Sequence, residues 1–87
     1  MPYTAEYIKN KLVNGLNALH VEVIDDSDGC GAKFSVTVVS DAFKNKPLLQ
    51  RHRLVNSILE DELKDIHAFS QKTLTPEQWE KQKEGTG

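Results

Sequence analysis

Cys30 and His67 are the residues of this chain whose types and settings best suit metal ligation. Cys30 is the only cysteine and lies between two glycines in DDSDGCGA, a stretch whose Asp, Ser and Gly residues are typical of a turn. The flanking glycines remove side-chain bulk, so the thiol could approach another molecule closely. His67 lies in IHAFSQKT, which has strand character. From these residues alone, an incidental thiol and a functional thiol are equally favoured, and a surface histidine is the simpler interpretation of His67.

A cationic cluster, Arg51-His52-Arg53, interrupts an otherwise apolar run in NKPLLQRHRLVN. His52 follows Leu48 by four residues and precedes Val55 by three, which places it at the margin of a helical apolar stripe. A structural histidine flanked by two solvent-facing arginines is the plainest interpretation. Guanidinium groups also suit an anionic partner, so the arginines are candidate partner-binding residues.

No catalytic or nucleotide-binding motif accompanies these residues. The chain has no Walker, Rossmann, CxxC or HExxH pattern and no Ser/His/Asp set. The carboxylates of Asp25-Asp26 and Glu60-Asp61-Glu62 are interpreted as solvated surface, and His20 is given no role. We therefore expect a protein that is not an enzyme.

Composition predicts one small soluble domain. The 87 residues carry a formal net charge of −2, with 38% hydrophobic and 28% charged residues. We expect a single domain over residues 1–84 and a frayed tail over 85–87. A lone cysteine favours a reducing compartment, and neither a signal peptide nor an apolar run of about 20 residues is seen. These features predict a cytoplasmic or also nuclear protein that does not enter a membrane.

The first half of the chain predicts a helix and a hairpin. Thr4 is a candidate N-cap for a helix with an apolar stripe at Ile8, Leu12, Leu16 and Leu19. HVEVID and KFSVTVVS then alternate as two strands, the second with Phe34, Val36 and Val38 on one face.

The second half predicts a helix, a strand and a final helix. After the loop DAFKNK, Pro47 opens a helix with Leu48, Val55 and Leu59 on one side, and EDELKD ends it. In IHAFSQKT, if Ile66 and Ala68 face the core, alternation turns His67 and Phe69 the other way. Thr75, Pro76 and Gln78 then form a capping box that starts the last helix.

The predicted order is therefore α-β-β-α-β-α. The middle helix acts as a crossover and should bring the third strand back parallel to one of the first two. The expected fold class is α+β, a two-layer sandwich with a three-stranded mixed sheet and helices on one face.

These stretches together resemble the BolA family. KPLLQRHRLVN, followed by IHAFSQKTLTPEQW, is most similar to the eukaryotic cytosolic branch that partners monothiol glutaredoxins, and TAEYIKNKL, HVEV and VVSDAF extend the similarity over nearly the whole chain. The resemblance implies a fold like the type II KH domain. It also implies a function, which is to bind a glutaredoxin and share a [2Fe–2S] cluster with it in iron–sulfur trafficking or iron sensing.

The resemblance also assigns roles to individual residues. His67 matches the ligating histidine of the last strand, and Cys30 falls at the second ligand position, with glutathione and a glutaredoxin cysteine supplying the remaining ligands. We further hypothesise that His52 orients the site and that Arg51 or Arg53 faces the partner or the glutathione carboxylates. Asn45 departs from the family's usual glycine, but asparagine tolerates left-handed backbone.

Two other classes of function stay open. A KH-like fold with Lys44, Lys46, Arg51 and Arg53 would permit nucleic-acid binding, although the net charge and the few aromatic residues argue against it. A plain scaffold with incidental Cys30 and His67 is the other alternative, and a homodimer through Cys30 is compatible with either.

Overall fold

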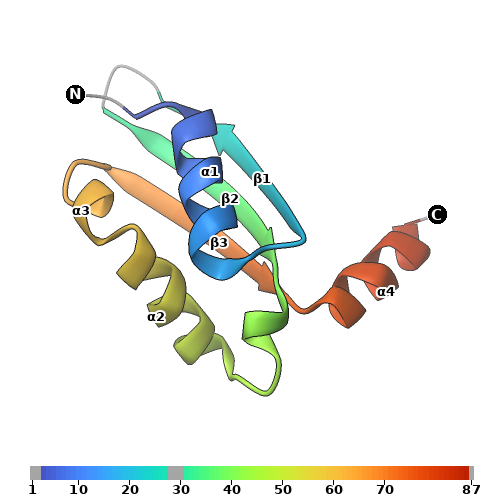
Figure 1. The fold of residues 1–87 in the computed structure, drawn as a ribbon. Coiled ribbons are helices and arrows are strands. Elements are labelled where there is room, and N and C mark those ends of the chain that lie inside the picture. Colours follow the sequence, from blue (N-terminus) through green and yellow to red (C-terminus); the bar gives the residue numbers. More distant parts are fainter. Residues whose placement is uncertain (1–2, 28–30, 87) are drawn as a thin grey trace.

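A computed structural model describes residues 3–27 and 31–86 of the chain. Its elements follow the predicted order with two short additions, a 3₁₀ helix and a one-turn helix before the last strand (Figure 1). They are α1 (Ala5–Leu16), β1 (His20–Asp25), β2 (Lys33–Val39), η1 (Asp41–Phe43), α2 (Leu48–Ile58), α3 (Glu60–Leu63), β3 (Ala68–Leu74) and α4 (Pro76–Thr86).

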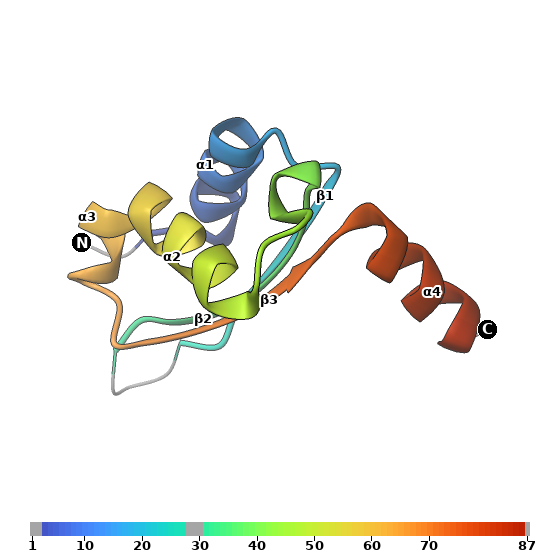
Figure 2. The same ribbon diagram turned by 90° about the horizontal axis from the view of Figure 1, so that it is seen from below.

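The sheet has the predicted mixed topology, with β2 between two edge strands. β1 pairs with β2 antiparallel, with Val21 opposite Val38, and β3 pairs with β2 parallel, with Phe34 opposite Phe69. Figure 2 shows α1 and α2 on one side of the sheet, while α4 extends away beyond the end of β3. The α+β two-layer architecture is therefore confirmed, with α4 outside the helical layer.

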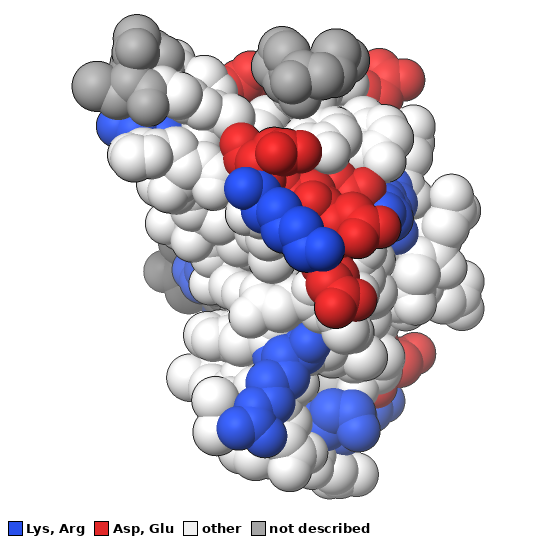
Figure 3. All heavy atoms as spheres, turned by 90° about the vertical axis from the view of Figure 1, so that its left-hand side faces the viewer, with Lys and Arg blue, Asp and Glu red and all other residues white. Residues whose placement is uncertain are grey.

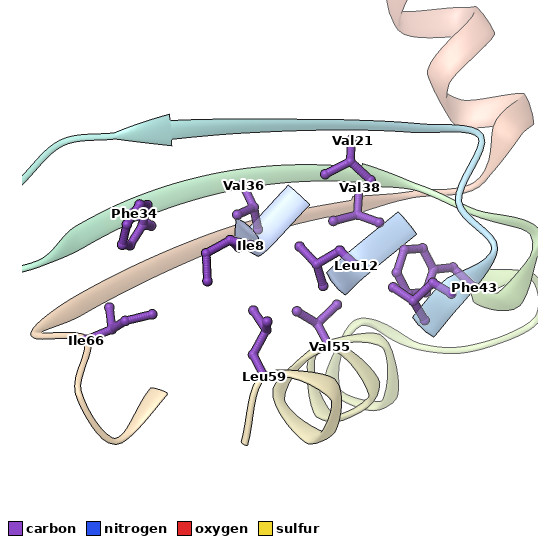
Figure 4. Packing of buried hydrophobic residues seen from close by; sticks show 11 residues of the cluster. Ile8, Leu12, Val21, Phe34, Val36, Val38, Phe43, Val55, Leu59 and Ile66 are labelled. Atoms are coloured by element: carbon purple, nitrogen blue, oxygen red, sulfur yellow. The ribbon is translucent and has the colours of Figure 1, made fainter. Parts of the chain in front are cut away.

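The hydrophobic core fills the space between this helical layer and the sheet (Figure 4). Its fully buried members come from α1, β2, η1 and α2 or its C-cap: Ile8, Leu12, Phe34, Val36, Val38, Phe43, Val55 and Leu59. The predicted inward face of β2 is confirmed. This small core anchors the turn before β3 through Ile66, which is only 9% exposed.

Two leucines assigned to apolar stripes are solvent-exposed instead. Leu19 is 66% exposed because α1 ends at Leu16 and Asn17 adopts a left-handed C-cap conformation with φ 49°. Leu48 is 60% exposed because it lies in the first turn of α2, a helix that buries only Val55. The predicted stripe of the first helix was therefore wrong at Leu19, which lies beyond the end of α1, and periodicity at Leu48 could not locate the edge of the core.

Three local predictions about caps and turns are confirmed. The Thr4 hydroxyl accepts a hydrogen bond from the Tyr7 amide at 3.0 Å, as expected of an N-cap. The Thr75 amide donates to Gln78 Oε1 at 3.0 Å and the Gln78 amide donates to Thr75 Oγ1 at 3.2 Å, which is a complete capping box. Asn45 has φ 61°, the left-handed backbone expected there.

The segment around α3 and β3 corrects two expectations. Glu60–Leu63 forms a separate short helix, and Glu62 is buried at 2% exposure instead of lying on a solvated surface. In β3 the alternation is the reverse of the conditional prediction: Phe69 packs against the core and Ala68 is exposed. The strand begins one residue after His67, so the periodicity of β3 does not extend back through Ile66.

Two predicted boundaries also shift. The loop DAFKNK contains η1, which Ser40 caps by accepting a hydrogen bond from the Ala42 amide at 3.0 Å. The tail expected to fray from residue 85 is helical as far as Thr86, while Gly87 lies outside the described residues. Within residues 3–27 and 31–86, no helix has the length and apolar character needed to cross a membrane.

Candidate functional site

His67 lies exposed in the turn that leads into β3, where the last strand meets the start of the second. Its backbone amide donates to the Ala32 carbonyl at 2.8 Å, and the Ala68 amide donates to the same carbonyl at 3.2 Å. Two amides on one carbonyl oxygen tie this turn to the residues just before β2. The backbone of His67 is thus fixed while its side chain faces solvent.

Gly31 packs directly against His67. A Cβ at position 31 would lie 3.1 Å from the Cβ of His67, and Gly31 has φ 130°, which L-residues rarely adopt. Glycine is therefore needed here both for backbone conformation and for close approach. Cys30, the residue next to Gly31 in the sequence, lies outside the described residues, so its predicted ligand role stays a prediction.

No complete metal site is formed by the described residues alone. Among residues 3–27 and 31–86, no group of three or more His, Cys, Asp or Glu side chains is placed to hold a metal ion. His67 is exposed, and Gly31, which packs against it, has no side chain of its own. Such a site fits a metal group that other molecules help to ligate.

A polar cluster links the turn before His67 to α1. The buried carboxylate of Glu62 accepts hydrogen bonds from Tyr7 Oη at 2.7 Å and from Lys11 Nζ at 2.5 Å. Burial by itself would raise the pKa of Glu62, but these bonds outweigh it and hold that pKa below its usual value. The same hydrogen bonds raise the pKa of Tyr7 and of Lys11.

Arg51 is largely occupied by the protein itself. Its Nε donates to the Lys46 carbonyl at 2.8 Å, and its Nη1 donates to the Thr73 carbonyl at 3.2 Å and to Gln78 Oε1 at 2.9 Å. These bonds join α2 to the end of β3 and to the capping box of α4. Arg53 is exposed, so of the two predicted partner-binding arginines it is the one presented to solvent.

His52 lies on α2, next to Arg51, which contacts the end of β3 away from His67. Arg51 reaches Thr73, which is six residues beyond His67 and thus separated from it by about 20 Å of strand. His52 itself is half-buried in α2. The site-supporting role predicted for His52 stays a prediction.

Charge is unevenly distributed on the side of the molecule that carries α2 and α3. Figure 3 shows acidic side chains gathered on one part of this side and basic side chains mostly on another. α3 carries the exposed Glu60 and Asp61, and α2 carries the exposed Arg53.

Trp79 forms a contact that the sequence reasoning missed. Its ring stacks on that of His20 with centroids 4.7 Å apart and an interplanar angle of 21°, and His20 Nε2 lies 2.8 Å from Glu22 Oε2. This contact joins α4 to β1. The signal available in the sequence was the single tryptophan placed four residues after the Thr75 N-cap, but nothing indicated its partner.

The BolA family model, described as BolA-like protein, matches residues 12–78. The chain belongs to the BolA-like family. The BolA-like protein 2 of Homo sapiens is 54% identical over 85 residues, covering 97% of this chain and 99% of that protein. The BolA-like protein 2 of Saccharomyces cerevisiae is 42% identical over 82 residues, covering 93% of this chain and 68% of that protein.

Solved structures agree with this BolA-like membership. The crystal structure of a bol-like protein from Babesia bovis has a TM-score of 0.88 and 41% sequence identity, and the match covers 93% of this chain and 94% of that one. The BolA domain of SufE1 from Arabidopsis thaliana has a TM-score of 0.78 and 37% identity, covering 88% and 96% of the two chains. The family resemblance inferred from the sequence motifs is therefore confirmed.

Proposed function

We propose that this BolA-like chain is a non-enzymatic partner of a monothiol glutaredoxin and shares a glutathione-containing [2Fe–2S] cluster with it, in iron–sulfur trafficking or iron sensing. The observation that carries the proposal is the exposed His67 packed against Gly31, one peptide bond from Cys30. His67 thus contacts the residue that follows Cys30 in the sequence.

Ligand number supports a shared cluster. A [2Fe–2S] cluster takes four ligands, usually thiolates, with histidine as the known replacement. This chain offers His67 and, from the sequence, Cys30, so two ligands come from elsewhere. A glutaredoxin thiolate and the thiolate of glutathione complete the set. Neutral imidazole in place of thiolate makes the cluster less negative, which suits transfer or sensing.

An exposed arginine on α2 supports contact with an anionic partner group. Arg53 is exposed on α2, and guanidinium pairs well with carboxylates such as those of glutathione. Arg51 already donates to three acceptors of its own chain, so we assign to it the orientation of α2 and α4 and assign the partner contact to Arg53.

Visible circular dichroism tests the proposal. The chain is mixed with a cluster-loaded monothiol glutaredoxin and glutathione, beside His67→Ala and a matched His20→Gln control at the opposite end of the sheet. We expect a new spectrum with wild type and with His20→Gln, and an altered or lost spectrum with His67→Ala. An unchanged glutaredoxin spectrum with wild-type chain would refute the proposal. An identical complex from a His67→Ala, Cys30→Ala double variant would refute the ligand assignment.

A further inference from the structure

We propose that Glu62 is a positioning residue for His67: its buried carboxylate binds the turn before β3 to α1 and so holds the His67 backbone against Gly31 and Ala32. The inference rests on the proposed function only for the importance of His67, because its structural basis lies entirely in the apo chain.

The first step is the contact between α3 and α1. Glu62 is 2% exposed, and its Oε2 accepts from both Tyr7 and Lys11, which lie four residues apart on α1. Its Oε1 is buried and has no hydrogen-bond partner among the described residues. Retaining a buried carboxylate is costly, and an apolar side chain of similar size would often stabilise such a position as well or better. The presence of a carboxylate at this buried position is explained if its hydrogen bonds fix the position of α3 relative to α1.

A second contact ties the other end of the same segment to Tyr3, just before the N-cap of α1. The Tyr3 hydroxyl donates to Asp65 Oδ2 at 3.2 Å, and the rings of Tyr3 and Tyr7 stack with centroids 5.2 Å apart. The segment from Glu62 to Asp65 is thus held at both ends by two tyrosines that contact each other. Its own backbone closes the turn, since the Asp65 amide donates to the Glu62 carbonyl at 3.0 Å.

The final step connects this segment to His67. Only four residues separate Glu62 from His67, and the last of them, Ile66, is buried in the core. Because both ends of the segment from Glu62 to Asp65 are fixed, the backbone between Asp65 and His67 has little conformational freedom. The His67 amide, which donates to the Ala32 carbonyl, is therefore held in place. A substitution of Glu62 should therefore weaken the His67–Ala32 hydrogen bond more than it weakens the hydrogen bonds at the centre of the sheet.

Amide hydrogen exchange of the apo protein tests this link without a partner or cluster. In Glu62→Gln, the amides of His67 and Ala68, which share the Ala32 acceptor, should exchange at least about tenfold faster, relative to the amides of Val36 and Val38 in β2. Asp61→Asn is the matched control, since it neutralises the neighbouring exposed carboxylate, which pairs with Lys64, and leaves both hydrogen bonds to Glu62 in place. It should leave all four amides unchanged.

Milder variants keep the test decisive if Glu62→Gln folds poorly. Tyr7→Phe removes one hydroxyl donor and Lys11→Met removes one cation, and each should accelerate His67 and Ala68 selectively, by a smaller factor. Equal acceleration at β2, or none at His67, in these variants would overturn the proposal, because Glu62 would then contribute to global stability alone. The two proposals can fail separately. If the variants accelerate exchange only at His67 and Ala68, while the wild-type chain leaves the spectrum of cluster-loaded glutaredoxin unchanged, the proposed function is refuted and this inference stands.

Discussion

Gly31 and His67 are packed so closely that a methyl group on residue 31 would lie 3.1 Å from the Cβ of His67. Because Gly31 also has φ 130°, an alanine there would be strained even without the contact. Gly31→Ala should therefore lower the free energy of unfolding by about 1–3 kcal/mol and displace His67. Chemical denaturation measures the first effect, and amide chemical shifts of residues 67 and 68 measure the second. A variant as stable as wild type with unchanged shifts would contradict this prediction.

Arg51 and Arg53 differ in what they contact, so the same substitution should have different effects. Arg51→Ala removes three hydrogen bonds, two to backbone carbonyls and one to Gln78, and should lower the free energy of unfolding by about 1–3 kcal/mol. Arg53→Ala removes an exposed side chain and should change the free energy of unfolding by less than about 0.5 kcal/mol. Urea unfolding of both variants provides the comparison, and equal losses would show that the contacts of Arg51 contribute little.

Arg53→Ala should instead weaken binding to glutaredoxin. The loss should be largest at low salt and should shrink as ionic strength rises, because exposed charges are screened. Titration calorimetry at two salt concentrations measures it. Unchanged affinity at low salt would exclude Arg53 from the interface. Tight binding of DNA or RNA that weakens steeply with salt would instead favour the nucleic-acid alternative.

Trp79 should report the docking of α4 on β1, since it is the only tryptophan of the chain and stacks on His20. His20→Ala removes the stacked ring and should change the fluorescence and near-ultraviolet circular dichroism of Trp79. His52→Ala, on α2, is the control and should leave both signals as in wild type. If His20→Ala also leaves both signals unchanged, the stacking does not persist in solution.

Acid should weaken the link between Glu62 and α1. The pKa of Glu62 is lower in the folded chain than its ordinary value of 4.5, so ionised Glu62 stabilises the fold fully above that pH, and the contribution is lost as the pH falls through the folded-state pKa. Wild type should therefore lose stability on acidification below about pH 4.5, and Glu62→Gln should lose less. Denaturation midpoints from pH 7 to pH 3 test this, and parallel curves would contradict it.

The short-range features of this protein follow from its sequence because their causes are local. Thr4 and Thr75 cap their helices through bonds to amides three residues away, and Asn45 takes a left-handed backbone that few residues tolerate. Alternation in β2 identified the inward Phe34. The two motifs within residues 46–79 identified the family, and with it His67 as the candidate ligand.

Only the tertiary structure decided which residues meet across long separations. Glu62 belongs to an acidic run that looks solvated, yet it is buried because Tyr7 and Lys11, more than fifty residues earlier, supply the donors that a buried carboxylate needs. Arg51 likewise contacts Thr73 and Gln78 only because β3 pairs with β2 and so lies next to α2. Gly31 and His67 meet for the same reason. Contacts of this kind depend on how the helices pack on the sheet, and short-range sequence patterns do not specify that packing.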